Sequence, residues 1–120
     1  DDLFHVWGTG NPLREFMFVD DLSKYIEYII DKEWGHDLIN VGTGDEISIK
    51  NLAYMIKTKL NYSGNIEFDK TKPDGNPRKL LNIERLINTG WNDFTDLDLG
   101  LEKTIDWYLN NLNSSRVITS

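Results

Sequence analysis

Cysteine is absent from this sequence, and histidine is scarce. Without cysteine the chain can form neither disulfides nor thiolate metal sites. The two histidines, His5 and His36, do not have the spacing of metal ligands, and no histidine–serine or histidine–aspartate set for nucleophilic catalysis is present. We therefore predict no metal site and no catalytic residue in this chain, and we expect it to carry a binding surface instead.

The sequence also lacks an excess of positive charge and any long apolar run. Its 13 basic and 20 acidic residues give a formal charge of −7, which argues against nucleic-acid binding. A small anionic ligand stays possible, because one local cation can outweigh a distant net charge. No run reaches the length of a membrane span, and no signal-peptide pattern is visible. We expect a cytoplasmic protein without a membrane partner.

Short apolar runs alternate with amphipathic stretches, which predicts a mixed α/β fold of three short strands and three to four helices. Asp20 or Asp21, Ser48 and Asn82 are placed to cap helices. Gly35 and Gly90 are placed to end helices. Strands are expected at 3–7, 38–41 and 66–68, a strand or extended segment at 16–19, helices at 20–34, 49–60, 83–88 and 97–112, and a polar loop at 70–79.

These elements form a single predicted domain over residues 1–112, with a disordered tail at 113–120. A sheet of so few short strands is only marginally stable by itself. We therefore expect the elements to pack against a larger domain outside this chain.

The first candidate site flanks the turn at 8–12, where Trp7 precedes the turn and Arg14 follows it. An arginine presents a planar fork of donors to phosphate oxygens, and an indole offers a flat face for stacking. The pair therefore suits a ligand with a ring and a phosphate. Alternatively, Trp7 belongs to the core and Arg14 pairs with Glu15 or Asp20 at the surface.

The second candidate site is the loop from Lys70 to Lys79, in which four basic residues surround Asp74. Its lysines and arginine could approach a phosphate, and the Asp74 carboxylate could accept hydrogen bonds from sugar hydroxyls. The alternative is a solvated charged turn, which composition alone favours.

Four patterns do not predict a site. Tyr28 and Lys32 have the Tyr-x-x-x-Lys spacing of a dehydrogenase active site, but they fall late in an amphipathic helix with no partner serine. The turn 42–44 lacks the third glycine of a dinucleotide fingerprint. The stretch 96–100 has too few oxygen ligands for calcium, and a helix cap explains Asp20 and Asp21.

Several segments together resemble the GDP-L-fucose synthase family of the extended short-chain dehydrogenase/reductases. The resemblance covers about residues 4 to 112, and the loop Phe-Asp-Lys-Thr-Lys-Pro-Asp-Gly-Asn-Pro-Arg-Lys-Leu-Leu is its most specific part. It is carried by the segments 6–22, 39–52, 68–81, 90–91 and 104–108.

The resemblance implies that this chain is the C-terminal, substrate-binding part of a longer enzyme. That enzyme would bind NADP(H) and carry its Ser-Tyr-Lys set, cysteine and histidine in an N-terminal Rossmann domain, and would be a homodimer. It would convert GDP-4-keto-6-deoxy-D-mannose to GDP-L-fucose. Two alternatives remain: a part of another nucleotide-sugar epimerase or dehydratase, or a non-catalytic α/β interaction module.

The resemblance also implies which residues bind the substrate. Trp7 and Arg14 match a tryptophan and an arginine that contact it, and Arg14 is expected at the diphosphate. Asp74 matches an aspartate at the nucleotide end, and Lys72 and Arg78 are secondary candidates beside it. Tyr28 and Lys32 do not correspond to the catalytic pair, so no catalytic or cofactor-binding residue is expected in this chain.

Overall fold

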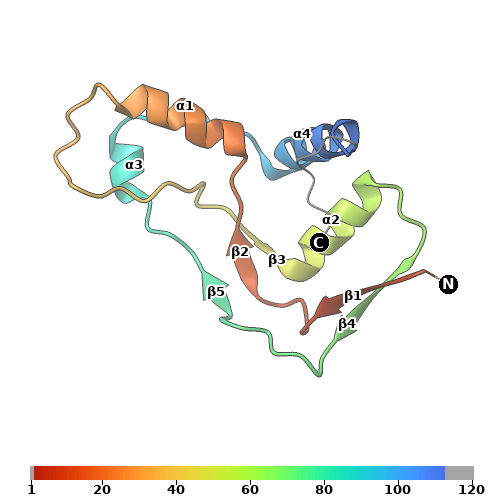
Figure 1. Cartoon of the computed structure of the whole chain (residues 1–120). Coiled ribbons are helices and arrows are strands. Elements are labelled where there is room, and N and C mark those ends of the chain that lie inside the picture. The colour runs from red at the N-terminus through yellow and green to blue at the C-terminus, as the bar shows by residue number, and fades with distance from the viewer. Residues whose placement is uncertain (1, 113–120) are drawn as a thin grey trace.

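The structure is a computed structural model that describes residues 2–112. It is a mixed α/β arrangement of short strands and four helices (Figure 1). In chain order the elements are β1 (Leu3–Trp7), β2 (Leu13–Glu15), α1 (Val19–Ile29), β3 (Glu46–Ser48), α2 (Ile49–Lys59), β4 (Asn65–Asp69), β5 (Arg78–Lys79), α3 (Glu84–Asn88) and α4 (Leu97–Asn110).

The strands form two separate small sheets. β1 and β4 pair in parallel, from Leu3 opposite Asn65 to Trp7 opposite Asp69. β2 lies between β3, which is antiparallel to it, and β5, which is parallel to it. The turn 8–12 connects the two sheets, so the residues on both sides of this turn are held by strand pairing.

At three helices a side chain at or just before the start accepts a hydrogen bond from a backbone amide. The Ser48 hydroxyl accepts a hydrogen bond from the Asn51 amide at 3.1 Å and caps α2 as predicted. The Asn82 side chain accepts a bond from the Glu84 amide at 3.0 Å at the start of α3, and Gly90 follows that helix with a φ of +88°. The Asp96 carboxylate caps α4 through the Leu99 amide at 2.9 Å.

The start of α1 differs from the prediction that Asp20 or Asp21 caps it. The N-cap residue is Phe18, which makes no side-chain cap, and both aspartates lie in the first turn. Asp21 is buried and accepts bonds from the backbone amide and the hydroxyl of Thr95, both at 2.7 Å. Its carboxylate thus connects α1 to the segment before α4. The helix ends at Ile29, well before Gly35.

One predicted strand, at 38–41, is wrong, and three strands, β2, β3 and β5, lie outside the predicted strand ranges. Residues 38–41 run close to α3 without a strand partner, and the Leu38 and Asn40 positions instead make single bonds to Arg85 and the Asn82 carbonyl. Residues 16–18 are extended but unpaired, because β2 is the segment just before them. The structure instead forms a three-stranded sheet of β3, β2 and β5. The predicted disordered tail lies outside the described residues.

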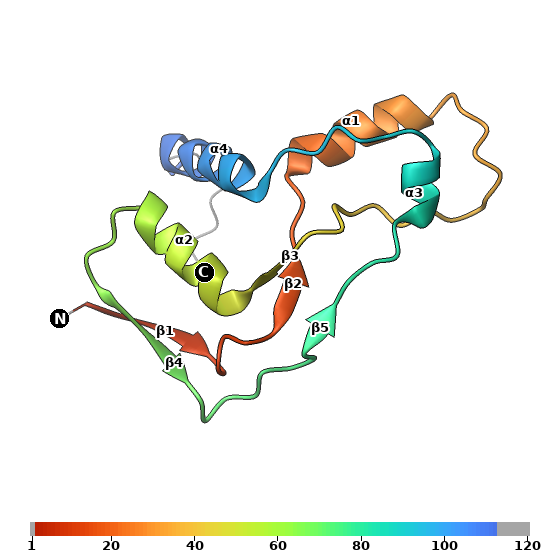
Figure 2. The ribbon, with the colours of Figure 1, turned by 180° about the vertical axis from the view of Figure 1, so that it is seen from behind.

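The molecule is long and thinly packed. Its radius of gyration is 17.3 Å and its extents are 56 × 35 × 25 Å. Figure 2 shows β1 and β4 at one end and α1 with α3 at the other. Among the described residues only Tyr25 and Leu86 are large apolar side chains with almost no exposure. They lie at the α1–α3 end, where the Tyr25 ring meets the Trp91 ring edge-on at 5.5 Å between centroids.

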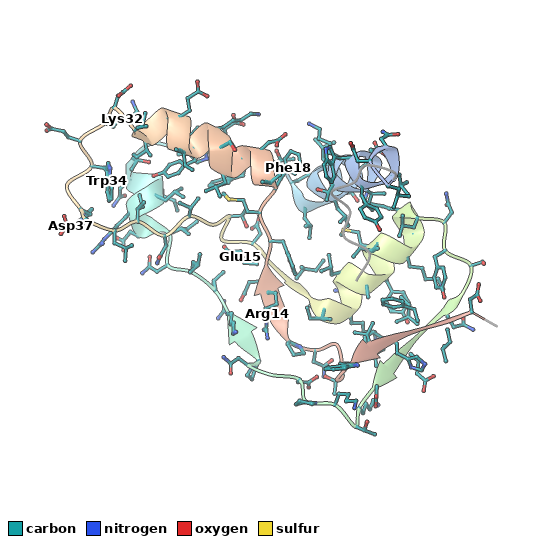
Figure 3. The ribbon with its side chains drawn as sticks, viewed as in Figure 1. Arg14, Glu15, Phe18, Lys32, Trp34 and Asp37 are labelled. Atoms are coloured by element: carbon teal, nitrogen blue, oxygen red, sulfur yellow. The ribbon has the colours of Figure 1, made fainter. Side chains whose placement is uncertain are left out.

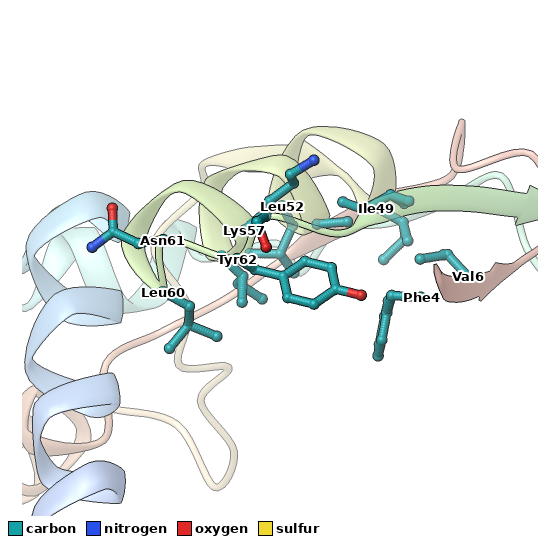
Figure 4. A pocket seen from close by; sticks show the side chains of 12 residues that line it. Phe4, Val6, Ile49, Leu52, Lys57, Leu60, Asn61 and Tyr62 are labelled. Carbon is teal, nitrogen blue, oxygen red and sulfur yellow. The ribbon is translucent and has the colours of Figure 1, made fainter. Parts of the chain in front are cut away.

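A large apolar hollow lies between α2 and the β1–β4 pair (Figure 4). Its volume is about 610 Å³, and Phe4, Val6, Leu52 and Ile66 are among the side chains that line it. Because side chains alternate along a strand, Trp7 projects from the opposite face of β1. The candidate site at Trp7 is therefore separate from this hollow.

Candidate nucleotide-sugar binding site

The polar loop 70–77 lies across the turn 8–12, and several hydrogen bonds hold the two together. The Gly8 amide donates to the Asp69 carbonyl at 2.9 Å, and the Leu13 amide donates to the Pro77 carbonyl at 2.9 Å. These bonds hold both ends of the loop beside the turn. Residues more than 60 positions apart in the sequence thereby form one surface.

Arg14 is the middle residue of β2 and is itself attached to this loop (Figure 3). Its Nη1 donates to the Leu13 carbonyl at 2.7 Å and to the Asn76 carbonyl at 2.8 Å. The guanidinium makes no ion pair with a described residue, so the predicted alternative of pairing with Glu15 or Asp20 is wrong. Glu15 instead accepts a bond from the Gly44 amide at 2.6 Å.

Asp74 lies at the centre of the loop and reaches back to the turn. Its two carboxylate oxygens accept bonds from the Thr9 amide at 2.6 Å and from the Thr9 hydroxyl at 2.8 Å. A methyl group on Gly8 would lie only 2.2 Å from an Asp74 oxygen, and one on Gly75 would lie 3.7 Å from Nη2 of Arg14. Asp74 thus lies against the turn that follows Trp7, and its neighbour Gly75 lies near the guanidinium of Arg14.

Trp7 is 70% exposed at the end of β1, so it is not a core residue of the described chain. The Lys72 ammonium lies 5.4 Å from the centroid of its ring, within the range of a cation–π interaction. The predicted alternative of a buried Trp7 is therefore wrong. The exposed Trp7 indole therefore offers a flat surface on which the ring of a ligand can stack, with the Lys72 cation close by.

Arg78, a secondary candidate, pairs with a residue of β3 and not with the loop 70–77. Its Nε and Nη2 donate to the two Glu46 oxygens at 2.6 and 2.8 Å, across β2 from β5 to β3. This bidentate bond raises the pKa of the Arg78 guanidinium above its ordinary value. The pair braces the three-stranded sheet, and the sequence gives no sign that Glu46 is the partner.

The loop also contains a second pairing of a threonine with an aspartate. The amide and hydroxyl of Thr71 donate to one Asp69 oxygen at 3.0 and 2.5 Å. The hydroxyl bond is the largest of the effects that lower the pKa of the Asp69 carboxyl. These bonds shape the start of the loop, just after the residue that pairs with Trp7 in the sheet.

Neither the turn 42–44 nor the Tyr28 and Lys32 pair fits a dinucleotide-dependent active site. The turn 42–44 faces the Glu15 carboxylate, whose oxygens would lie 2.6 and 2.8 Å from a methyl group on Gly42. An anion in that position would repel a diphosphate. Tyr28 donates its hydroxyl to the Thr89 carbonyl at 2.5 Å, and the Lys32 ammonium lies over its ring at 4.4 Å, so neither is arranged as an acid–base pair.

Neither a metal-binding cluster nor a membrane-spanning helix is present among the described residues. No group of three or more histidine, cysteine, aspartate or glutamate side chains in this part of the chain could hold a metal ion. No helix within it is long and apolar enough to cross a bilayer.

Comparison with known proteins first identifies the class of protein. No family model matches the chain. Among solved structures, a GDP-L-fucose synthetase from Naegleria fowleri bound to NADP superposes with a TM-score of 0.88 at 27% identity, over 95% of this chain and 36% of that one. The fold is that of part of an extended short-chain dehydrogenase/reductase.

The sequence comparisons show which enzymes of this class the chain is similar to. GDP-L-fucose synthase 1 of Arabidopsis thaliana is 44% identical over 107 residues, which are 89% of this chain and 33% of that protein. GDP-L-fucose synthase of Escherichia coli is 39% identical over an alignment of 122 positions, which covers 92% of this chain and 37% of that protein. The chain is therefore homologous to part of the GDP-L-fucose synthases, and it spans about a third of their length.

Proposed function

We propose that this chain is the part of a GDP-L-fucose synthase that binds the GDP-sugar substrate. The complete enzyme would convert GDP-4-keto-6-deoxy-D-mannose to GDP-L-fucose with NADPH. One observation carries the proposal: the loop 70–77 lies across the turn 8–12, where Asp74 binds Thr9 close to the exposed Trp7 and Asn76 binds Arg14. Trp7, Arg14 and Asp74 are the three residues that the family resemblance assigns to the substrate.

Arg14 has the chemistry for the diphosphate. Two backbone carbonyls hold Nη1, while Nε and Nη2 donate to no described residue. A guanidinium fixed at one nitrogen loses little side-chain entropy when its other donors bind phosphate oxygens. It also supplies local positive charge in a chain whose net charge is negative.

Trp7 and Asp74 would hold the remainder of the nucleotide. The exposed indole offers a stacking face, and the Asp74 carboxylate has lone pairs beyond the two that Thr9 uses. Binding of this remote part of the substrate would position the sugar for reactions at residues outside this chain. Reduction would require NADPH, which the proposal assigns to a part of the enzyme outside this chain.

The test is to express the complete reading frame that contains this sequence and to follow NADPH oxidation with GDP-4-keto-6-deoxy-D-mannose. We expect turnover, and we expect GDP to compete with the substrate far better than UDP does. Stronger competition by UDP would instead indicate another nucleotide-sugar epimerase or dehydratase. A protein that binds neither nucleotide would contradict the proposal and favour an interaction module.

A further inference from the structure

Among the residues that the structure describes, Thr9 is the one that donates hydrogen bonds to the Asp74 carboxylate. Its amide and its hydroxyl each donate to a different oxygen of the carboxylate, at 2.6 and 2.8 Å, across 65 positions of sequence. Two donors on two oxygens fix both the position of the carboxylate and its rotation. Thr9 itself carries no charge and no ring, so neither composition nor motif spacing suggests a role for it.

The direction of the hydroxyl bond follows from a third contact. The Asn11 amide donates to Thr9 Oγ1 at 3.2 Å, so a lone pair of that oxygen is already used as an acceptor. The hydroxyl has a single proton, and the Asp74 oxygen is its acceptor. The Thr9 hydroxyl therefore accepts a hydrogen bond from the turn and donates one to the loop.

The position of Asp74 leaves no room for a bulkier neighbour. A methyl group on Gly8 would lie 2.2 Å from its Oδ1 and 3.3 Å from its Cα, and Gly8 also has a φ of +85°. The turn 8–12 thus receives the carboxylate directly against its backbone. An ionised carboxylate offers about four acceptor positions, of which Thr9 takes two, so two remain for a ligand.

We propose that Thr9 is a positioning residue, which orients the Asp74 carboxylate so that its remaining lone pairs receive ribose hydroxyls of the nucleotide. The inference rests on the proposed function, in which Asp74 binds the nucleotide end of the substrate. It adds the prediction that Thr9 controls how strongly the site distinguishes ribose from deoxyribose, although Thr9 itself does not contact the ligand.

A matched control lies on the same loop. Thr71 and Asp69 make the same kind of amide-plus-hydroxyl pairing, but both residues are local to the start of the loop and do not hold Asp74. Thr71→Val therefore removes an equivalent hydroxyl bond and leaves the Asp74 carboxylate anchored. A purely structural role for Thr9 predicts that Thr9→Val and Thr71→Val have the same consequences.

The experiment measures binding of GDP, 2′-deoxy-GDP and 3′-deoxy-GDP to the complete protein by calorimetry. We expect the wild type to bind GDP at least tenfold more tightly than one of the deoxy analogues, because that analogue leaves a charged acceptor unpaired. Thr9→Val should weaken GDP binding about tenfold and leave the deoxy analogue almost unaffected, so the discrimination falls toward one. Thr9→Ser, which keeps the hydroxyl, should retain the discrimination between GDP and the deoxy analogue.

Several results would overturn the inference while leaving the proposed function intact. One is a Thr9→Val protein that binds GDP as tightly as the wild type does. Another is a loss of affinity that is equal for GDP and both deoxy analogues, or that Thr71→Val reproduces. If Thr9→Val does not fold, Thr9→Ala removes the same hydroxyl with less bulk and is judged by the same criteria. A wild type that fails to bind GDP would contradict the proposed function itself.

Discussion

Arg14 shows how one side chain serves both the fold and the proposed ligand. One nitrogen of its guanidinium is held by two backbone carbonyls, and the rest of the fork is directed to no described residue. A lysine in this position would keep the charge, but a single ammonium cannot hold two carbonyls and also present a planar pair of donors to a diphosphate.

At the residue scale we therefore expect Arg14→Lys to raise the KM for the GDP-sugar of the complete enzyme by about tenfold, and Arg14→Ala to raise it by about a hundredfold. The kcat should change much less, since the lost contact lies away from the reacting carbons. Steady-state kinetics with NADPH in excess measures both constants. A lysine variant with the wild-type KM would show that the fork geometry is not used.

The carboxyl of Asp69 gives a prediction about pH. Its pKa in the folded protein is lowered, first by the hydroxyl bond from Thr71. The unfolded chain then binds more protons, so this group stabilises the folded state above its unfolded pKa, and the stabilisation is lost as the pH falls through the folded pKa. Thr71→Val should move the Asp69 pKa back toward its ordinary value, which an NMR titration of the carboxyl measures.

At the scale of elements, local signals predicted some segments well and others poorly. Ser48 and the apolar stripe that follows it define α2 within a dozen residues, and Leu3–Trp7 is a strand by its own run of residues. Residues 38–41 have the same kind of apolar run but no backbone partner, so no strand forms. β3 and β5 carry no apolar pattern of their own, and they are strands because β2 lies between them.

The same distinction between local sequence signals and long-range contacts applies to the candidate site. Trp7 and Arg14 could be named from one turn and a family resemblance, because both are close in sequence. That Asp74 reaches this turn depends on contacts made over 65 positions. The anchoring role of Thr9 and the pairing of Arg78 with Glu46 therefore become visible only in three dimensions.

Asp21 allows a test of how two elements are joined. It is buried, and its carboxylate satisfies both the amide and the hydroxyl of Thr95, whereas its neighbour Asp20 is exposed in the same helical turn. Asp21→Ala should lower the free energy of unfolding by about 1–3 kcal/mol, because the part-buried Thr95 amide loses its acceptor. Asp20→Ala should cost less than about 1 kcal/mol, the contribution of one charge to the helix dipole. Denaturant titration of both variants measures the difference, and equal losses would contradict the bridging role.

The whole molecule is more extended than a compact domain of its length. A globular chain of 120 residues has a radius of gyration of roughly 14 Å, whereas the value here is 17.3 Å. Phe4 is exposed on a sheet of only two parallel strands, and parallel sheets are ordinarily covered by other elements. The sequence-based expectation that these elements pack against a larger domain is consistent with this shape, and it stays a prediction.

We therefore expect residues 1–120 expressed alone to lack NADPH oxidation and to show rapid amide exchange in β1 and β4, together with strong binding of a hydrophobic dye. The same amides should be protected in the protein expressed from its complete reading frame. Hydrogen exchange followed by mass spectrometry compares the two. Equal protection in both would mean that the small sheets are stable without further packing.

The parallel pairing of β1 with β4 has a consequence for synthesis on the ribosome. Leu3 must wait for Asn65, about 60 residues later, and at about 5–20 residues per second this takes several seconds. Throughout that interval the nascent strand has neither its neighbour nor a cover for Phe4 and Val6. Slower translation ahead of residue 65 would prolong this vulnerable period, so the yield of folded protein should depend on codon choice in that stretch and on chaperone supply.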